Sequence, residues 1–185
     1  MWIARTRNIY TYAGEPWGLD NGAFRDWAER KPFDGDQFQR VLDKALQHPK
    51  PLLAVIPDAP GNATGTMNML DEWLPTLPDL PWYVAVQDGM EPEHLEGYPI
   101  SGVFLGGTNR YKATAPLWRE WTHQNGLPFH FGRCGTPNKV AFAMEVGADS
   151  IDSAFPMWSE ARWNFFVDVV TNGPHQLSLL GALAL

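Results

Sequence analysis

The chain has 185 residues, 44% of them hydrophobic, and a formal net charge of −7. This length and hydrophobic content exclude a disordered chain and predict one domain over residues 1–185 with a core of its own. The negative charge argues against a general nucleic-acid coat protein, but it is compatible with an enzyme that has a local basic groove.

The cysteine content and the apolar segments bear on the cellular setting. The single cysteine, Cys134, excludes an internal disulfide framework and a multi-cysteine zinc site, and it is typical of a reducing environment. The apolar segment from Leu177 to Leu185 is too short for a membrane span, which needs about 20 residues, and no signal peptide is evident. We therefore expect a cytoplasmic protein with no membrane contact.

Short apolar runs alternate with segments of helical periodicity along the chain. The runs predict strands at residues 1–12, 17–20, 51–58, 82–87, 102–107, 129–131 and 150–155. The helical spacing predicts helices at residues 38–46, 64–74, 115–125, 138–146 and 159–170, the first with Asp34 or Asp36 as its N-cap. Such alternation indicates a parallel sheet, either open or closed into a barrel.

Polar residues at the carboxyl ends of the predicted strands favour the closed form. These residues are Asp20, Asp58, Gln87, the pair Gly106-Gly107, Arg133 and Asp152. In a (β/α) barrel all strand ends converge on one mouth, whereas an open sheet brings together only the residues that flank its switch point. We therefore predict a compact (β/α) TIM-type barrel of six or seven strands, with reduced or irregular first strands.

Two or three acids, one amide and a pair of backbone amides are suited to chemistry at an anomeric carbon. One carboxylate can act as the nucleophile while another moves a proton. Asp152 lies within a predicted strand, where burying a carboxylate without a role would be costly. Asn21, Gln87 and the glycine backbone are suited to reading the edge of a planar base.

Two other kinds of site are compatible with these residues. Cys134 and His130 could form a thiol nucleophile with its base, although a cysteine in a glycine turn is more often structural. Four acids could bind Mg²⁺, which prefers carboxylates: Asp20, Asp58, Asp88 and Asp152. They come from non-adjacent strands without clustered spacing, so we expect neither a metal nor another cofactor.

Five short motifs lie at the ends of the predicted strands. They are Asp20–Phe24 (DNGAF), Ile56–Asp58 (IPD), Val86–Gly89 (VQDG), Leu105–Gly107 (LGG), and Gly135–Pro137 (GTP) followed by a helix and by Ser150–Pro156 (SIDSAFP). In the same order, they resemble the DSGG-aromatic, LDE, VQGG, GGL, and GxGTP with FDCxLP motifs of the tRNA-guanine transglycosylases. The resemblance covers residues 17–158 and implies a (β/α)8 barrel with transglycosylase activity.

The resemblance implies a role for each matched residue. Asp152 matches the nucleophile that attacks C1′ of a nucleotide and forms a covalent intermediate. Asp20 matches the general acid/base that handles the proton of the departing and the incoming base. The implied base contacts are Asp58 and Gln87 at the base edge, Gly106 and Gly107 as backbone donors to the exocyclic oxygen, Phe24 stacked on one face and Phe131 packed on the other.

The chain departs from the tRNA enzymes in ways that change the expected polymer. The CxCxxC…H zinc site is missing, and Arg133 adds one residue to the GxGTP turn. These features resemble the short phage and bacterial branch that exchanges guanine in DNA for a 7-deazaguanine such as preQ0. The resemblance thus favours DNA over tRNA as the partner, with a 7-deazaguanine base as the second substrate and a homo-oligomer or partner protein as a further expectation.

An acidic barrel mouth must bind phosphates at its rim. Four cations are predicted on turns at that end, beside Tyr111 and Trp158, which could stack on a neighbouring base: Arg110, Lys112, Arg133 and Arg162. We predict that these side chains contact the nucleic acid.

Three other functions fit the same residues. One is a queuine- or preQ1-type tRNA-guanine transglycosylase, and the second is a nucleobase-excising glycosylase or hydrolase that uses water as acceptor. The third is a non-enzymatic barrel that binds nucleobases. The presence of both Asp20 and Asp152 argues against the third, because binding alone requires no acid at the anomeric carbon.

Overall fold

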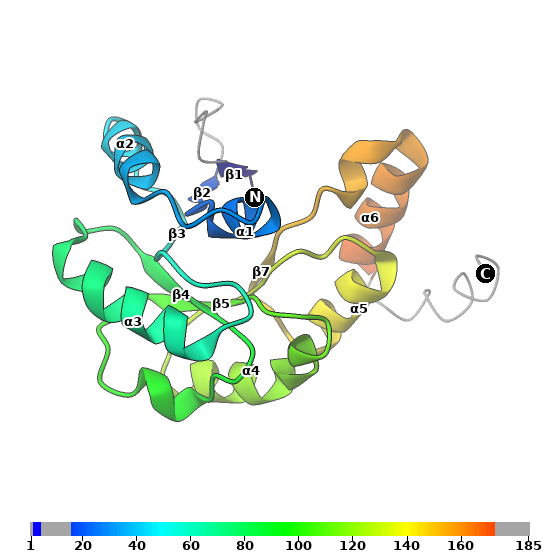
Figure 1. Ribbon diagram of the computed structural model, residues 1–185. Coiled ribbons are helices and arrows are strands. Elements are labelled where there is room, and N and C mark those ends of the chain that lie inside the picture. Colours follow the sequence, from blue (N-terminus) through cyan, green and yellow to red (C-terminus); the bar gives the residue numbers. More distant parts are fainter. Residues whose placement is uncertain (1, 5–15, 173–185) are drawn as a thin grey trace.

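The computed structural model describes residues 2–4 and 16–172 of the chain (Figure 1). Seven parallel strands form one sheet in chain order. They are β1 (Trp2–Ala4), β2 (Trp17–Leu19), β3 (Leu53–Val55), β4 (Trp82–Val86), β5 (Gly102–Leu105), β6 (Phe129–Phe131) and β7 (Ser150–Ile151). The predicted parallel α/β architecture is thereby confirmed.

Six α-helices and four short 3₁₀ helices lie between and after these strands in the described part of the chain. The α-helices are α1 (Ala23–Ala28), α2 (Gly35–Ala45), α3 (Ala63–Trp73), α4 (Ala115–Gln124), α5 (Pro137–Glu145) and α6 (Glu160–Asn172). The 3₁₀ helices are η1 (Leu74–Thr76), η2 (Pro92–Leu95), η3 (Tyr111–Thr114) and η4 (Phe155–Trp158). Asp34, Asn62 and Thr136 accept backbone N–H groups at the first turns of α2, α3 and α5, so the N-cap predicted at Asp34 is confirmed.

Helix α1 is an element that the sequence did not predict. The turn expected at Asn21 runs directly into it, because Gly22 adopts a left-handed φ of 79° and the side-chain oxygen of Asn21 accepts a hydrogen bond from the N–H of Ala23 at 2.8 Å. These two local devices start the helix immediately after the end of β2.

The strands place alternate side chains in two apolar layers. On β4, Trp82, Val84 and Val86 belong to the large core that packs against the helices, whereas Tyr83 and Ala85 belong to a smaller cluster on the opposite face. Figure 1 shows α2, α3, α4 and α5 arranged around the outside of the curled sheet, so the smaller cluster occupies its inner face. Both faces of the central strands are therefore buried, as their continuous apolar runs predict.

The sheet curls without closing among the described strands. β1 and β7 are its two edges, and its strands contain only two to five residues. A barrel closes by pairing its first and last strands, and that pairing is not made here. The structure thus shows a curled, open parallel sheet where a closed barrel was predicted. Most of the first predicted strand, residues 5–12, and the apolar segment that begins at Leu177 lie outside the described residues.

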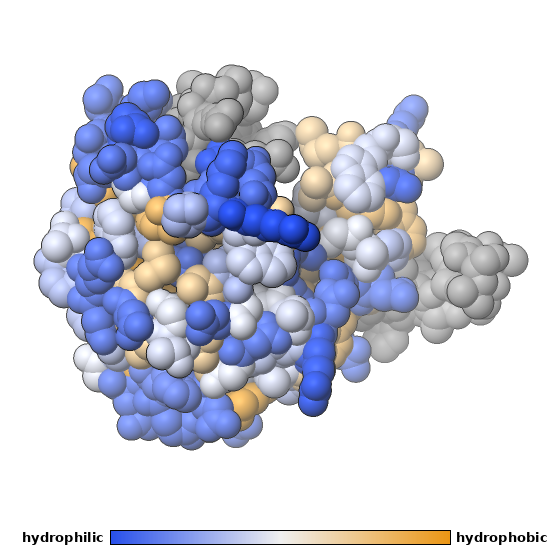
Figure 2. Space-filling model, in the orientation of Figure 1, coloured by the Kyte–Doolittle hydropathy of each residue, from blue (hydrophilic) through white to orange (hydrophobic). Residues whose placement is uncertain are grey.

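Exposed apolar side chains gather over η4 and α6, as Figure 2 shows at the edge of the molecule. They are Met157, Trp158, Trp163, Val167 and Val170. Only Val169 of α6 is fully buried, whereas α2 buries four apolar side chains, so α6 contributes less to the core. None of the described helices combines the length and apolar character that crossing a membrane requires.

Candidate active site

The predicted site residues follow the carboxyl ends of successive strands. Asp20 follows β2, Asp58 follows β3, Gln87 follows β4, Gly106 follows β5 and Asp152 follows β7. Because the carboxyl ends of parallel strands lie at one edge of a sheet, the fold places all of them along that edge. Asp152 comes directly after β7, so it lies at the end of a shorter strand and not within the predicted one.

A buried carboxylate, Asp58, is held between two amide side chains. Its Oδ1 accepts a hydrogen bond from Nδ2 of Asn21 at 2.6 Å, and its Oδ2 accepts one from Nε2 of Gln87 at 2.6 Å. Asn21 also donates to the carbonyl oxygen of Ile56 and accepts from the N–H of Ala23. Asn21 therefore positions Asp58, and one lone pair of its oxygen is left over. The base contact predicted for Asn21 stays a prediction.

The Gln87 amide joins the turns that follow β3 and β5. Its Oε1 accepts hydrogen bonds from the N–H groups of Gly61 at 3.0 Å and Gly107 at 2.9 Å. The N–H of Gly106 donates to the carbonyl oxygen of Val86 at 3.0 Å. The two N–H groups predicted to bind the exocyclic oxygen of a base are thus engaged within the protein. Glycine is required at position 106 for close packing, since a Cβ there would lie 2.5 Å from Nε2 of Gln87.

Asp58 is an unusually weak acid. Burial raises its pKa to about 7; the hydrogen bond from Asn21 opposes this rise, and the negative charge of Asp20 adds to it. Asp20 is therefore close enough to Asp58 for the charge of one carboxylate to affect the protonation of the other. Near neutral pH the Asp58 carboxyl group populates both protonation states and can exchange a proton.

Asp152 has the opposite tendency. Its Oδ1 accepts hydrogen bonds from Nε2 of His130 at 3.1 Å and from the backbone N–H of Arg133 at 2.8 Å. Burial alone would raise the pKa of Asp152, but the hydrogen bonds from His130 and from the N–H of Arg133 together hold it below its ordinary value. Asp152 is therefore an anion at neutral pH, as a carboxylate nucleophile must be.

His130 is a site residue whose partner the sequence analysis missed. Its side chain is fully buried, its Nδ1 lies 2.8 Å from Oγ of Ser150, and its ring stacks on Phe104 at 4.5 Å between centroids. The strand register could have revealed this contact, because His130 pairs with Ser150 across β6 and β7. Asp152 lies two residues beyond Ser150, on the same face of the strand.

Cys134 does not pair with His130. Its Sγ contacts the carbonyl oxygens of Phe131 at 3.6 Å and Lys139 at 3.9 Å, and it is fully buried. Burial raises the pKa of the Cys134 thiol to about 12, so it holds its proton at neutral pH. This environment is typical of a structural cysteine, and the alternative of a thiol nucleophile loses its geometric basis.

Arg133 lies inside the site and not only at its rim. Its backbone has a left-handed φ of 55°, and its guanidinium donates to the carbonyl oxygen of Gly107 at 2.6 Å. The guanidinium carbon lies 4.2 Å from the ring centroid of Phe24, on the aromatic side chain predicted to stack on a base. Burial lowers the Arg133 pKa, while the charges of Asp152 and Asp58 oppose that change, so the cation sits among the acids of the site.

Lys112 and Phe131 are almost fully buried, and both line a hollow of about 380 Å³ beside α5. Lys112 is only 3% exposed, and its Nζ donates to the carbonyl oxygens of Leu105 and Gly132, each at 2.7 Å. Burial lowers its pKa to about 7. Phe131 is 1% exposed and packs edge-on against Phe142. Because its ammonium group is engaged by two carbonyl oxygens, Lys112 serves the fold, and the ligand contacts predicted for Lys112 and Phe131 stay predictions.

The remaining predicted contacts are exposed. Arg110 lies on the surface between β5 and η3, and Phe24 is 44% exposed beside Trp27. The Arg162 guanidinium lies 4.8 Å from the ring centroid of Trp158. These cations and rings are available to a nucleic acid at the surface.

The acids do not form a metal-ion cluster. Both carboxylate oxygens of Asp88 bind Thr108, at 2.7 Å to its N–H and 2.5 Å to its hydroxyl. Burial alone would raise the Asp88 pKa, but these hydrogen bonds lower it. Within residues 2–4 and 16–172, no three side chains of His, Cys, Asp or Glu are grouped closely enough to hold a metal ion.

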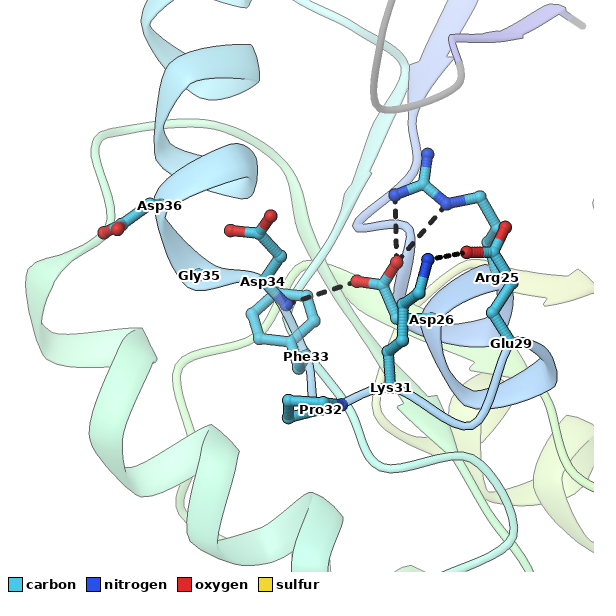
Figure 3. A pocket seen from close by; sticks show the side chains of 9 residues that line it. All are labelled: Arg25, Asp26, Glu29, Lys31, Pro32, Phe33, Asp34, Gly35 and Asp36. Carbon is cyan, nitrogen blue, oxygen red and sulfur yellow. Dashed lines mark hydrogen bonds and ion pairs between the residues drawn. The ribbon is translucent and has the colours of Figure 1, made fainter.

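A separate hollow of about 570 Å³ lies between α1 and the start of α2 (Figure 3). Its charges are paired with one another: Arg25 binds Asp26 at 2.9 Å, and Lys31 binds Glu29 at 2.6 Å. Asp26 also accepts the N–H of Asp34 at 3.2 Å. The hollow contains none of the predicted site residues, and the hydrogen bond between Asp26 and Asp34 links α1 to the N-terminus of α2.

Fold and site together define an α/β protein with an acidic site at the carboxyl edge of a parallel sheet. No family model matches the sequence, and a search of curated proteins finds no match either. The residues at the strand ends, and the motifs they form, therefore provide the basis for assigning a function.

Proposed function

We propose that this protein is a transglycosylase that replaces guanine in a nucleic acid with a 7-deazaguanine such as preQ0, through a covalent bond between Asp152 and the sugar. One observation carries the proposal: two carboxyl groups at the same sheet edge have pKa values displaced in opposite directions. The pKa of Asp152 lies below its ordinary value, and that of Asp58 is raised to about 7. The low pKa keeps Asp152 anionic, as a nucleophile must be, and the raised pKa suits Asp58 to binding a base beside Asp20, the proposed acid/base.

In the first half of the reaction, a carboxylate oxygen of Asp152 forms a bond to C1′ of the nucleotide. The C1′–N9 bond breaks, its electron pair stays with the base, and Asp20 supplies a proton to the departing guanine. In the second half, Asp20 takes the N9 proton of the incoming base. N9 then attacks C1′, the bond between C1′ and Asp152 breaks, and the Asp152 carboxylate is freed. Each step balances without a metal ion or redox cofactor.

Asp58 and Gln87 would contact the edge of the base. A carboxylate has about four lone-pair positions, so Asp58 can accept further N–H donors beyond Asn21 and Gln87. Guanine and 7-deazaguanines present two such donors, N1–H and the 2-amino group. Their N–C–N edge has the same planar donor pattern as the Arg133 guanidinium, which already stacks on Phe24 near these acids.

Arg133 and a stacked base would compete for the same face of Phe24. Replacing Arg133 with alanine is expected to tighten the binding of free 7-deazaguanine about 5- to 10-fold, because no stacked cation must be displaced. Isothermal titration calorimetry measures this change. Arg30→Ala is the matched control, since Arg30 also has a left-handed φ, of 57°, but is exposed outside the site. Weaker base binding in Arg133→Ala would show that the guanidinium supports the base.

The polymer should bind through the exposed cations. Combining Arg110→Ala with Arg162→Ala is expected to reduce the slope of log affinity against log salt by about one unit for each lost phosphate contact. Free-base binding should not change. Lys50→Ala serves as the control, because Lys50 is an exposed cation that precedes β3, at the opposite edge of the sheet. An unchanged slope in the double variant would place the nucleic acid on another face.

We propose that the polymer is DNA and not tRNA. We also propose that the fold is a reduced (β/α) TIM-type barrel and that the protein acts in the cytoplasm. The test is the release of labelled guanine from single-stranded DNA, duplex DNA and tRNA. Single-stranded DNA should react fastest, because a paired base must first leave the stack at a cost of a few kcal/mol. Release only from tRNA would favour the queuine- or preQ1-type enzyme.

The same assay separates the remaining alternatives. Exchange requires an incoming base and leaves an intact sugar-phosphate chain, whereas a hydrolase releases guanine without one and leaves abasic sites. A protein that only binds nucleobases releases no label from any polymer. Either of these two outcomes would overturn base exchange.

A further inference from the structure

His130 links two side chains through a single buried ring. Its Nδ1 lies 2.8 Å from Oγ of Ser150, and its Nε2 lies 3.1 Å from Oδ1 of Asp152. The ring is fully buried and is held flat against Phe104, with 21° between the ring planes. The parallel register of β6 and β7, which pairs His130 with Ser150, sets this arrangement.

The chemistry of the partners determines where the histidine proton lies. The Asp152 carboxylate can only accept a hydrogen bond, so Nε2 must carry a hydrogen. Burial disfavours a charged ring and lowers the His130 pKa, so Nδ1 carries none. The Ser150 hydroxyl must therefore donate to Nδ1. The resulting chain runs from the hydroxyl of Ser150 through the ring to Oδ1 of Asp152.

We propose that His130 is a positioning residue for the Asp152 nucleophile, held in its Nε2–H tautomer by the carboxylate and kept in place by Ser150, so that Oδ1 is engaged and Oδ2 faces the sugar. This inference rests on the proposed function. Both described hydrogen bonds to the Asp152 side chain, from His130 and from the Arg133 N–H, end on Oδ1. The carboxylate plane is thereby fixed, and one oxygen remains for attack.

The same two donors suit the covalent intermediate. When Oδ2 bonds to C1′ and the C1′–N9 bond breaks, Oδ1 becomes the carbonyl oxygen of an ester. It can still accept both N–H groups, and it regains negative charge when the incoming base displaces the sugar. Donors that stay in place through both half-reactions need no rearrangement at either step.

His130 does not serve as a general base in this scheme. Its side chain is fully buried, its Nε2 is directed at Asp152 and its Nδ1 at Ser150, so neither ring nitrogen is free to take a proton from a base. The field of Lys112 reaches both members of the pair, where it favours the anionic form of Asp152 and disfavours protonation of His130. The charge of Arg133 interacts with that of Asp152.

Nitrogen-15 NMR of histidine-labelled protein tests the tautomer without reference to activity. The His130 ring is expected to show a protonated Nε2 and an unprotonated Nδ1 across neutral pH. Ser150→Ala removes the donor to Nδ1 but leaves the Asp152 carboxylate, so Nε2 should stay protonated in this variant as well. A protonated Nδ1 in the wild-type protein would overturn the proposal, whether or not the protein exchanges bases.

Kinetics test the consequence for Asp152. His130→Phe keeps a ring against Phe104 but removes the donor; we expect kcat to fall about 10- to 100-fold with KM within about twofold. The acid limb of the pH–rate profile should move to higher pH, because Asp152 loses a hydrogen bond to its anionic form. His130→Gln, which can donate through its amide, should recover part of the rate.

His123→Phe is the matched control, since His123 is exposed on α4 and should leave the rate and the profile unchanged. An unshifted acid limb in a folded His130→Phe protein would overturn the positioning role. If His130→Phe fails to fold, Ser150→Ala, which keeps the donor but frees one end of the ring, should shift the acid limb in the same direction by a smaller amount. A wild-type protein without exchange activity would refute the proposed function, while the NMR experiment would still decide the tautomer.

Discussion

Asp152→Asn is expected to abolish base exchange, lowering kcat by on the order of 10⁴-fold or more, while leaving the fold intact. An amide cannot form the ester to C1′, so the covalent route is lost. The fold should persist because the asparagine oxygen can still accept hydrogen bonds from His130 and from the N–H of Arg133. Label release from DNA measures the activity, and circular dichroism with thermal unfolding checks the structure.

The neighbouring acid Asp149 provides the matched control. Its carboxylate accepts the N–H of Phe129 at 2.8 Å and binds Arg119 at 3.0 Å, on the far side of β7 from the proposed reaction. Asp149→Asn should therefore retain most of the exchange activity. Exchange that survives in Asp152→Asn would move the nucleophile to another acid, with Asp20 the next candidate.

Asp58 should make the wild-type protein less stable as the pH rises. Its pKa is raised from 3.8 to about 7 in the folded protein, so the folded state binds a proton that the unfolded state has already released. The stabilisation from this proton is complete below about pH 4 and is lost as pH rises through 7. At about 1.4 kcal/mol per pKa unit, the change approaches about 4 kcal/mol.

Asp58→Asn should remove this pH dependence. Denaturant unfolding at a series of pH values between 4 and 8 gives the difference in unfolding free energy between wild type and variant. As the pH rises, we expect the unfolding free energy of the wild type to fall relative to that of Asp58→Asn. Asp79→Asn, which alters an exposed carboxylate, is the control and should follow the wild type. Parallel curves for wild type and Asp58→Asn would show that Asp58 titrates like an ordinary aspartate.

Local sequence signals predicted the architecture well. The continuous apolar run before Asp58 and the one before Gln87 both form strands buried on two faces, and glycine or proline marks the turns that follow them. Such signals depend on residues that are neighbours in the chain, so they can be recognised from the sequence alone. The same signals located the acids that follow β2, β3 and β7.

Contacts between strands could not be predicted in the same way. Lys112 lies in a polar turn, NRYKA, which is typical of a solvated surface. Its ammonium group is nevertheless buried and donates to the carbonyl oxygens of Leu105, at the end of β5, and Gly132, after β6. His130 has no nearby acid in the sequence, and only the register of β6 and β7 brings Asp152 to it. Closure of the sheet depends on pairing between its two edge strands, β1 and β7. These strands lie far apart in the sequence, so no local pattern specifies whether they pair.

Trapping the covalent intermediate tests the central claim most directly. The protein is mixed with guanine-containing DNA without an incoming base, denatured rapidly, digested and analysed by peptide mass spectrometry. The proposed function predicts a sugar-linked DNA fragment on the peptide that contains Asp152, and its absence in Asp152→Asn. Guanine release with no adduct, or an adduct on a different residue, would contradict it.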